Sequence, residues 1–157
     1  MKITLLVIGK TDKDFVKLGI AEYEKRLKRY ISYEMRVIPD VKKGKNLTED
    51  LQKEKEGDLI LAQIKAGDVM VLLDEGGKEF TSVEFARHLE QKMLSGIKNL
   101  VFVVGGPYGF SKEVYQRAHG KISLSRMTFS HQMIRMIFVE QVYRAMTILK
   151  GEPYHHV

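Results

Sequence analysis

Two glycine-rich segments each follow an apolar run, and both raise the possibility of a ligand held against the backbone. The motif GGPYG at 105–109 follows the run 100–104, and Gly76–Gly77 follow the run 69–73. Glycines after a strand allow a ligand or another backbone to approach closely. Their spacing fits neither a Walker loop nor a dinucleotide fingerprint, and a proline in the turn removes one backbone donor. The glycines could simply allow tight turns of the backbone. If they instead line a ligand site, the loops suit a neutral heterocycle and a thioether chain better than a triphosphate.

A third polar segment, LSRMTF at 124–129, ends the apolar run that begins at Lys121. In open parallel sheets, ligands bind beyond the carboxyl ends of the strands. We therefore expect the two glycine segments and residues 124–129 to converge and form one pocket.

The elements that must position these loops alternate between strand-like and helix-like patterns. Helix-starting signals are Asp12, Thr48, Ser111 and the capping box Thr81–Glu84, and a last, strongly apolar helix is expected over 131–149. Such alternation predicts an α/β fold, a mainly parallel sheet with helices on both faces, built as a single domain over 1–157. The expected strands are Ile3–Ile8, Tyr33–Ile38, Val69–Leu73, Leu100–Val104 and Lys121–Leu124.

Composition limits the class of protein and of partner. The 157 residues carry a net charge of +6 and no cysteine, so disulfides and thiolate metal sites are excluded. With no signal-peptide pattern and no run long enough to span a bilayer, we expect a cytoplasmic protein. Residues 100–157 hold seven Lys or Arg against three acidic residues, which favours a nucleic-acid or nucleotide partner over a merely solubilising surface. Candidate phosphate contacts are Lys112, Arg117 and Lys121, and the loop Lys42–Asn46 is either a solvated linker or a further RNA contact.

The expected helix over 131–149 is apolar on more than one face. Packing on a single sheet needs only one apolar stripe, and a domain of this size offers little room to surround a central helix. We therefore expect a homodimer through this helix, with two-fold symmetry.

Several ordered motifs resemble one known family. GGPYG lies about twenty residues before LSRMTFSHQMIRMIFVEQVYRA, the chain begins MKITLLVIGK, and it ends GEPYHHV. Together these are similar to the RlmH family, pseudouridine N3-methyltransferases of bacterial 23S rRNA within the SPOUT superfamily. Many members have proline after MTF, where this chain has Ser130, a residue that can cap the following helix through its hydroxyl. The resemblance covers the whole chain.

The resemblance implies a C-terminal trefoil knot, a homodimer, and S-adenosyl-L-methionine bent into the knot loops as methyl donor, with no metal. The partner it implies is 23S rRNA in the ribosome or large subunit, and no membrane is involved. The cofactor-binding positions that it implies are Leu73, Gly105, Leu124, Ser125, Arg126, Met127, Thr128 and Phe129. Arg126 is expected to meet RNA or the surroundings of the cofactor, unless it is a solvated loop arginine.

Methylation of N3 of a pseudouridine requires a group that takes the imide proton. His155 is the first candidate because the ordinary pKa of histidine lies near neutrality, and His156 is a weaker one. Either could instead be a solvated terminal histidine. His131 could touch the substrate or simply pack at the helix start.

Glu140 and Arg144 are four residues apart on the last helix and can pair. In so apolar a helix, the pair is expected near a site or the dimer seam, with Arg144 contacting an RNA phosphate or the base. Tyr143 is either a core residue or a platform for the base. Tyr154 could stack on the base, bond a carbonyl or pack the tail.

Two other functions remain open at this point. One is a non-catalytic ribosome-associated RNA-binding factor with the same fold, and the other is a tRNA ribose methyltransferase of the same superfamily. The PYHH sequence of the tail favours base chemistry over simple binding.

Overall fold

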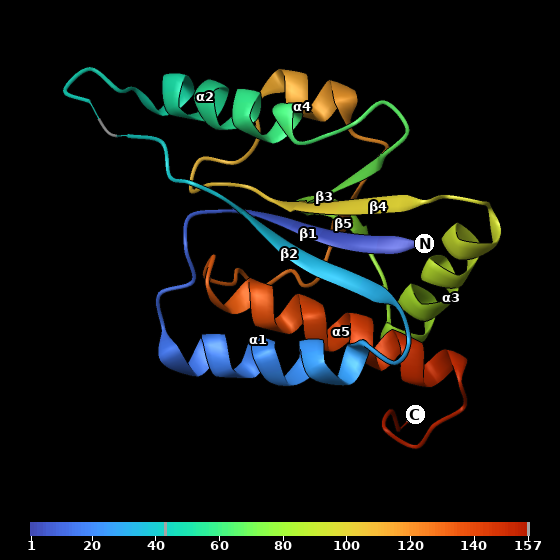
Figure 1. Cartoon of the computed structure of the whole chain (residues 1–157). Helices are drawn as coiled ribbons and strands as arrows, with labels where there is room; N and C mark the ends of the chain where they lie inside the picture. Colours follow the sequence, from blue (N-terminus) through green and yellow to red (C-terminus); the bar gives the residue numbers. More distant parts are fainter. Residues whose placement is uncertain (43, 157) are drawn as a thin grey trace.

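A computed structural model describes residues 1–42 and 44–156 of the chain. Within them, five parallel strands form one sheet in the order β2-β1-β4-β3-β5 (Figure 1). The strong apolar runs explain the buried β1 and β4, since a strand covered on both faces needs apolar residues at every position. The strands are β1 Lys2–Ile8, β2 Ser32–Ile38, β3 Val69–Glu79, β4 Asn99–Val104 and β5 Gly120–Ser123.

Helices cover both faces of the sheet, as the sequence predicted. On one face α5 lies between α1 and α3, and on the other α2 packs with α4 (Figure 1). The α/β class with a parallel sheet is therefore confirmed. The helices are α1 Asp14–Leu27, α2 Glu49–Ala62, α3 Ser82–Leu94, α4 Lys112–Arg117 and α5 Met133–Leu149.

The core has two parts, one under each helical layer. Side chains alternate along a strand, so Phe102 of β4 faces α5 whereas Val101 and Val103 face the α2–α4 layer. Phe102 packs on Phe138 of α5 with ring centroids 4.8 Å apart. Burial of such aromatic pairs fixes the start of α5 against the middle of the sheet.

Strand β3 is longer than predicted, because it does not end at Leu73 but continues through the glycines to Glu79. Both Leu73 and Lys78 pair with Ile122 of β5, so β3 arches past its neighbour with a shift of register. A Cβ on Gly77 would lie 2.6 Å from the Ile122 backbone. This glycine accommodates another backbone, as its sequence position suggested, rather than a ligand.

Most helix-start predictions are confirmed. The side chain of Thr48 accepts a hydrogen bond from the Leu51 amide, and Thr81 with Glu84 forms a full capping box. Ser111 caps α4 in the same way. The hydroxyl of Ser130 accepts from the Met133 amide at 3.1 Å, so it caps the first turn of α5 where family members often have proline.

The prediction that Asp12 caps the first helix is wrong. The residue before α1 is Lys13, which makes no side-chain capping bond. The Asp12 amide instead donates to the side-chain oxygen of Gln132 at 2.8 Å, which ties the segment before α1 to the start of α5.

The surroundings of α5 correct the reasoning used for the dimer. The chain itself covers much of this helix, because α1 and α3 flank it and Phe138, Val142 and Met146 are buried in the core. What remains is a half-buried outer stripe that mixes apolar and polar side chains, Met133, Ile137, Glu140, Gln141, Arg144 and Ile148.

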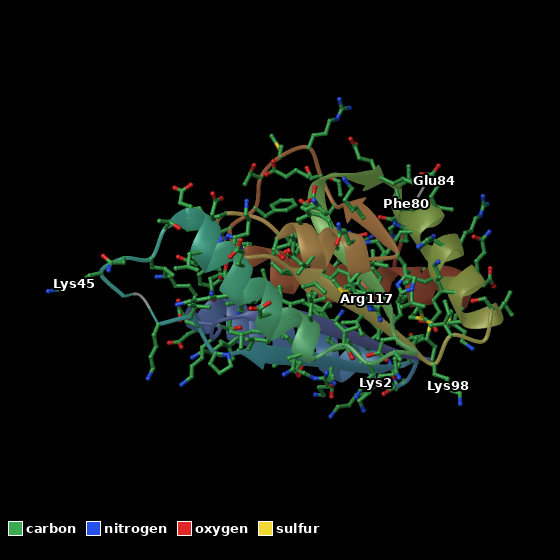
Figure 2. The ribbon with its side chains drawn as sticks, turned by 90° about the horizontal axis from the view of Figure 1, so that it is seen from above. Lys2, Lys45, Phe80, Glu84, Lys98 and Arg117 are labelled. Atoms are coloured by element: carbon green, nitrogen blue, oxygen red, sulfur yellow. The ribbon has the colours of Figure 1, made fainter. Side chains whose placement is uncertain are left out.

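The β2–α2 loop projects from the body, with Lys45 at its tip (Figure 2). Lys42 and Lys45 are exposed, and Lys43 lies outside the described residues. Arg117, expected to contact phosphate, donates instead to the backbone oxygens of Lys65 and Asp68. Among the described residues, no helix combines the length and apolar character needed to cross a membrane.

Candidate active site

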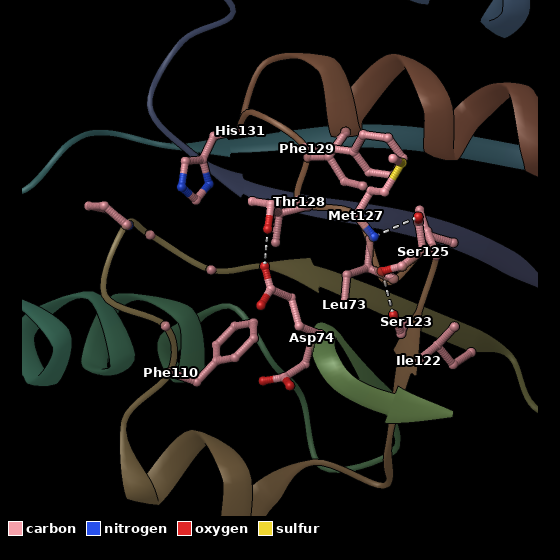
Figure 3. Close-up of a pocket in the computed structure, with 18 residues that line it drawn as sticks. Leu73, Asp74, Phe110, Ile122, Ser123, Ser125, Met127, Thr128, Phe129 and His131 are labelled. Atoms are coloured by element: carbon pink, nitrogen blue, oxygen red, sulfur yellow. Dashed lines mark hydrogen bonds between the residues drawn. The ribbon is translucent and has the colours of Figure 1, made fainter. Parts of the chain in front are cut away.

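The carboxyl ends of β3, β4 and β5 surround a cavity of about 380 Å³, here called the strand-end pocket (Figure 3). Its volume lies in the range of small-molecule sites. The three loops selected from the sequence do converge, at the edge of the sheet where parallel strands place ligands. The lining residues are Leu73, Asp74, Glu75, Val104, Gly105, Gly106, Pro107, Gly109, Phe110, Ile122, Ser123, Leu124, Ser125, Met127, Thr128, Phe129, His131 and Ile134.

The glycine loop after β4 is closely packed from behind. A Cβ on Gly105 would lie 3.1 Å from the ring of Phe110, and one on Gly106 would lie within 3 Å of the Glu56 carboxylate. A side chain at 105 would require the Phe110 ring to shift, and one at 106 would require the Glu56 side chain to move, so here the backbone itself forms this wall. Burial raises the pKa of Glu56, whose Oε1 is buried with no hydrogen-bond partner among the described residues.

Residues 124–131, here called the pocket loop, are held by short-range hydrogen bonds (Figure 3). The Ser123 hydroxyl donates to the Ser125 carbonyl at 2.9 Å, and the Met127 amide donates to the Ser125 hydroxyl at 2.9 Å. Across the cavity, the Thr128 hydroxyl donates to Glu75 at 2.7 Å. This last bond joins the pocket loop to the segment after Leu73.

All but one of the expected cofactor-binding residues line the pocket. The exception is Arg126, whose side chain is 88% exposed and whose Nε lies 3.5 Å from Glu79. The loop turns this side chain outward while its neighbours face the cavity. Those neighbours, with the other expected residues, are Leu73, Gly105, Leu124, Ser125, Met127, Thr128 and Phe129.

Sequence reasoning missed several lining residues. Asp74 and Glu75 follow Leu73 directly in a segment already expected to face the ligand, so their position was an available signal. Asp74 accepts from the Tyr115 hydroxyl, and burial together with that bond raises the pKa of Tyr115 to about 12. Phe110 and Ile134 gave no comparable signal, because buried apolar residues in a loop and a helix read as core.

The proposed catalytic residues form a second group, here called the tail cluster: Glu140, Arg144, Tyr154 and His155. Arg144 donates to Glu140 through Nε at 3.1 Å and through Nη2 at 2.6 Å. The side chains are 25% and 16% exposed, so this is a shielded pair rather than a surface one. Burial alone would lower the pKa of Arg144, but the hydrogen bond and charge of Glu140 raise it overall.

Tyr154 anchors the tail against α5. Its hydroxyl donates to Glu140 at 2.9 Å, and its ring packs edge-on against Tyr143 with centroids 4.7 Å apart. The Arg144 guanidinium lies 4.7 Å from the centre of the same ring. Burial, with hydrogen bonds to Tyr23 and Glu140, raises the pKa of Tyr154. Tyr143 itself is 8% exposed and belongs to the core. Of the two roles expected from sequence, core residue or platform for the base, its position fits the first.

His155 is held by the same arginine. Its Nδ1 lies 3.2 Å from Nη1 of Arg144, and because a guanidinium only donates, a hydrogen bond between them needs Nδ1 as the acceptor. His155 is therefore ordered rather than loose, but its free lone pair is already engaged by Arg144. His156 is exposed.

The tail cluster and the strand-end pocket are separated within one chain. No residue of the cluster lines the pocket, and the pocket reaches α5 only at Ile134. With a rise of about 1.5 Å per residue, Glu140 lies about 9 Å and Arg144 about 15 Å farther along the helix. A catalytic group must come within about 3.5 Å of the reacting atoms. Within one chain the cluster therefore does not adjoin the wall of the pocket.

No group of three or more His, Asp or Glu with metal-binding geometry occurs in residues 1–42 and 44–156. Besides backbone and apolar side chains, the cavity is lined by the carboxylates of Asp74 and Glu75 and by the polar side chains of Ser123, Ser125, Thr128 and His131.

Comparison with known proteins gives relatives along the full length of the chain. A protein of Parabacteroides distasonis is 65% identical over 156 residues, which cover 99% of each chain. Proteins of Bacteroides thetaiotaomicron and Flavobacterium johnsoniae are 60% and 57% identical, with the same coverage. All three carry the name Ribosomal RNA large subunit methyltransferase H. The family described as "Predicted SPOUT methyltransferase" matches residues 1–155. The chain therefore belongs to the SPOUT methyltransferase family.

Proposed function

We propose that this chain is a methyltransferase that transfers a methyl group from S-adenosylmethionine to N3 of a pseudouridine in 23S rRNA, and that it acts as a homodimer. The observation that carries the proposal is the convergence of three strand ends on one pocket that lacks lysine and arginine. The relatives named as large-subunit rRNA methyltransferases support the choice of RNA.

The pocket residues fit the proposed methyl donor. Leu73, Leu124 and Phe129 offer apolar walls for an adenine and a thioether chain, while the glycine backbone offers close polar contacts. Because the Phe110 ring crowds any Cβ at position 105, the backbone of Gly105 itself forms this part of the pocket wall. When bound, S-adenosylmethionine supplies an electrophilic methyl group on a sulfonium. The residues expected to hold it are Leu73, Gly105, Leu124, Ser125, Met127, Thr128 and Phe129, with Arg126 at the outer rim.

The separation of the pocket from the tail cluster supports a site shared by two copies. In a two-fold dimer that pairs the α5 helices antiparallel, the Arg144 end of one helix lies against the Ile134 end of the other. The outer stripe of α5 supplies a surface for this contact. The adjacent α1 exposes Phe15 by 61% and Leu18 by 72%, which such a contact could cover. Membership of the SPOUT family implies, in addition, the trefoil knot in the C-terminal part.

The tail cluster then has distinct roles in this proposal. Glu140 orients Arg144 and Tyr154 through three hydrogen bonds to one oxygen, Oε1. Arg144 contacts the base or a neighbouring phosphate, and doing so releases Nδ1 of His155. The freed nitrogen takes the N3 proton of the pseudouridine, which is a general-base role typically worth about 10²–10⁴ in rate. The pocket walls exclude water and align the reacting atoms.

Nucleoside mass spectrometry of rRNA tests the proposal directly. A deletion strain should lack 3-methylpseudouridine, and purified protein with S-adenosylmethionine should restore it on large subunits or ribosomes. Restoration of ribosome binding without methylation would favour the non-catalytic factor. Loss of a ribose methyl from tRNA, with rRNA unchanged, would favour the tRNA enzyme. In either case the proposed reaction is refuted.

A further inference from the structure

Arg135 stands out as the largest side chain that is fully buried in the described residues, at 1% exposure. Its Nε donates to the His131 carbonyl at 2.9 Å. Its Nη1 donates to the Gly9 carbonyl at 2.8 Å and to the Thr11 hydroxyl at 3.1 Å, and its Nη2 to the Ile8 carbonyl at 2.9 Å. Every one of these acceptors is neutral, so the arginine lies against backbone and hydroxyl oxygens rather than in an ion pair.

This arrangement is costly for the folded state. Burial lowers the pKa of Arg135, and the carboxylates of Asp12 and Asp40 oppose that effect only at a distance. The residue also places a cation in the first turn of α5, next to the positive end of the helix dipole. Removing the guanidinium would also cost stability, because the carbonyls of Ile8 and Gly9 would lose the bonds that they accept from it. The bonds therefore offset the cost of burying the cation, and they fix the segments that they join.

Gln132 makes a second connection to the same segment. Its side-chain nitrogen donates to the Lys10 carbonyl at 3.2 Å, and its oxygen accepts from the Asp12 amide at 2.8 Å. Arg135 and Gln132 thus make six hydrogen bonds, five to residues 8–12 and one to the His131 carbonyl. Residues 8–12 follow β1, in the middle of the sheet, and are a rigid place to fasten a loop.

The bonds of Arg135 and Gln132 hold the C-terminal end of the pocket loop. Phe129 and His131 line the pocket on one side of this turn, and Ile134 lines it on the other. At its other end the loop follows directly from β5, and its middle is held by the bond between Thr128 and Glu75. Without Arg135, the C-terminal part of the loop would keep the bonds of Gln132, the Ser130 cap and the bond from the Ile134 amide to the Ser130 carbonyl.

We infer that Arg135 is a positioning residue that holds the pocket loop in its binding conformation before the methyl donor arrives. The inference rests on the proposed function of the pocket. Fixing a loop in advance removes the ordering cost from binding, and so increases affinity without a direct contact. The predicted signature is that loss of the guanidinium weakens binding and loosens the pocket loop, whereas a comparable loss of stability elsewhere in α5 does neither.

The test compares Arg135→Met and Arg135→Lys with the wild-type full chain. Calorimetry with S-adenosylmethionine and S-adenosylhomocysteine should show about tenfold weaker binding of both to the methionine variant, with a partial recovery for lysine. Thermal unfolding of each variant measures the loss of stability with which its loss of affinity is compared. Val142→Ala is the matched control, since it removes a buried α5 contact away from the pocket. It should lower the unfolding temperature and leave affinity unchanged.

Hydrogen exchange in the ligand-free protein separates this inference from the proposed function. Peptides covering 124–131 should exchange faster in Arg135→Met than in wild type, while those from the middle of α5 should not. If Arg135→Met does not fold, Thr11→Val and Gln132→Ala each remove part of the connection, and each should weaken binding about two- to fivefold. Unchanged affinity and unchanged loop exchange in the folded variants would overturn the inference. Wild-type protein that binds neither compound would overturn the proposed function instead, and the exchange result would still stand.

Discussion

The strand-end pocket is walled by backbone and apolar side chains, whereas the tail cluster is held together by charged and phenolic groups. The pocket draws on three strand ends and the first turn of α5. The cluster needs only α5 and the tail, with Glu140 accepting bonds from both. One region is built to enclose a ligand, and the other to present charge and a histidine. About two to three turns of α5 lie between them, so the two regions do not adjoin within one chain.

Substitutions in the two regions should therefore impair different properties of the protein. Changes in the pocket should affect affinity for the methyl donor, and changes in the cluster should affect the methylation step. A change at an apolar position of the outer stripe of α5, such as Ile137, should affect the step without altering a residue of either region. Four experiments test this division, and the largest expected effect comes first.

Ile137→Glu places a charge on the half-buried outer stripe of α5. We expect a monomer by analytical ultracentrifugation, with methylation reduced on the order of 10³-fold because the cluster no longer meets a pocket. Affinity for S-adenosylmethionine should remain close to that of wild type. Leu94→Glu is the control, since this leucine is 82% exposed at the end of α3 and its replacement should leave the dimer intact. A fully active monomeric variant would refute the shared site.

Gly105→Val adds a side chain where Phe110 leaves no room. Affinity for S-adenosylmethionine should fall about 100-fold, which corresponds to about 2.7 kcal/mol, while the dimer persists. Gly67→Ala serves for comparison, because a Cβ there meets no atom within 4 Å. Calorimetry gives the affinity, and wild-type binding by Gly105→Val would remove the strand-end pocket from the proposal.

Mixing two inactive proteins sharpens the comparison further. Gly105→Val lacks the pocket and Glu140→Ala lacks the cluster, so each homodimer should be nearly inactive. After random exchange of subunits, half of the dimers are mixed and each has one intact site, so about a quarter of the wild-type activity should return. No recovery, with exchange verified by native mass spectrometry, would show that pocket and cluster act within one chain.

Glu56→Gln should have the smallest effect, and it acts on stability. Burial raises the pKa of Glu56, so the folded state favours the protonated carboxyl, and ionisation at neutral pH costs stability. Glutamine should therefore stabilise the protein by about 1 kcal/mol at pH 7. The gain should shrink as the pH falls through the raised pKa and vanish below the ordinary value for glutamate, about 4.3. Urea unfolding across this range measures it, and the exposed Glu54→Gln provides the control. A gain that grows in acid would contradict the assignment.

Much of the fold could be predicted from sequence because local signals and pattern agreed. Thr48, Thr81 and Ser111 begin helices through bonds to amides within the next few residues, and such signals need no tertiary information. Asp12 has the same chemistry, yet Gln132, 120 residues away, takes its amide as a partner. The extension of β3 to Glu79 was equally hidden, because it depends on pairing with β5.

The pocket could be located because strand ends mark it, but its details could not. Arg126 lies among residues that face the cavity, and only the course of the loop turns it outward. Arg135 looked like one more charge on a helix, since the carbonyls that it binds at Ile8 and Gly9 are more than 120 residues away. For His155, sequence suggested a base or a free terminus, while the structure shows a third state in which Arg144 holds the ring.

The arch of β3 over Ile122 has a consequence for the evolution of this chain. Gly77 is only half-buried and lines no cavity, yet the neighbouring main chain occupies the space of any side chain there. In a saturation-mutagenesis survey, this position should tolerate substitution as poorly as the centre of β4. A ranking of positions by solvent exposure would place Gly77 among those that tolerate substitution. The low tolerance seen in the survey would therefore reflect the nearby backbone of Ile122 and not burial of the residue.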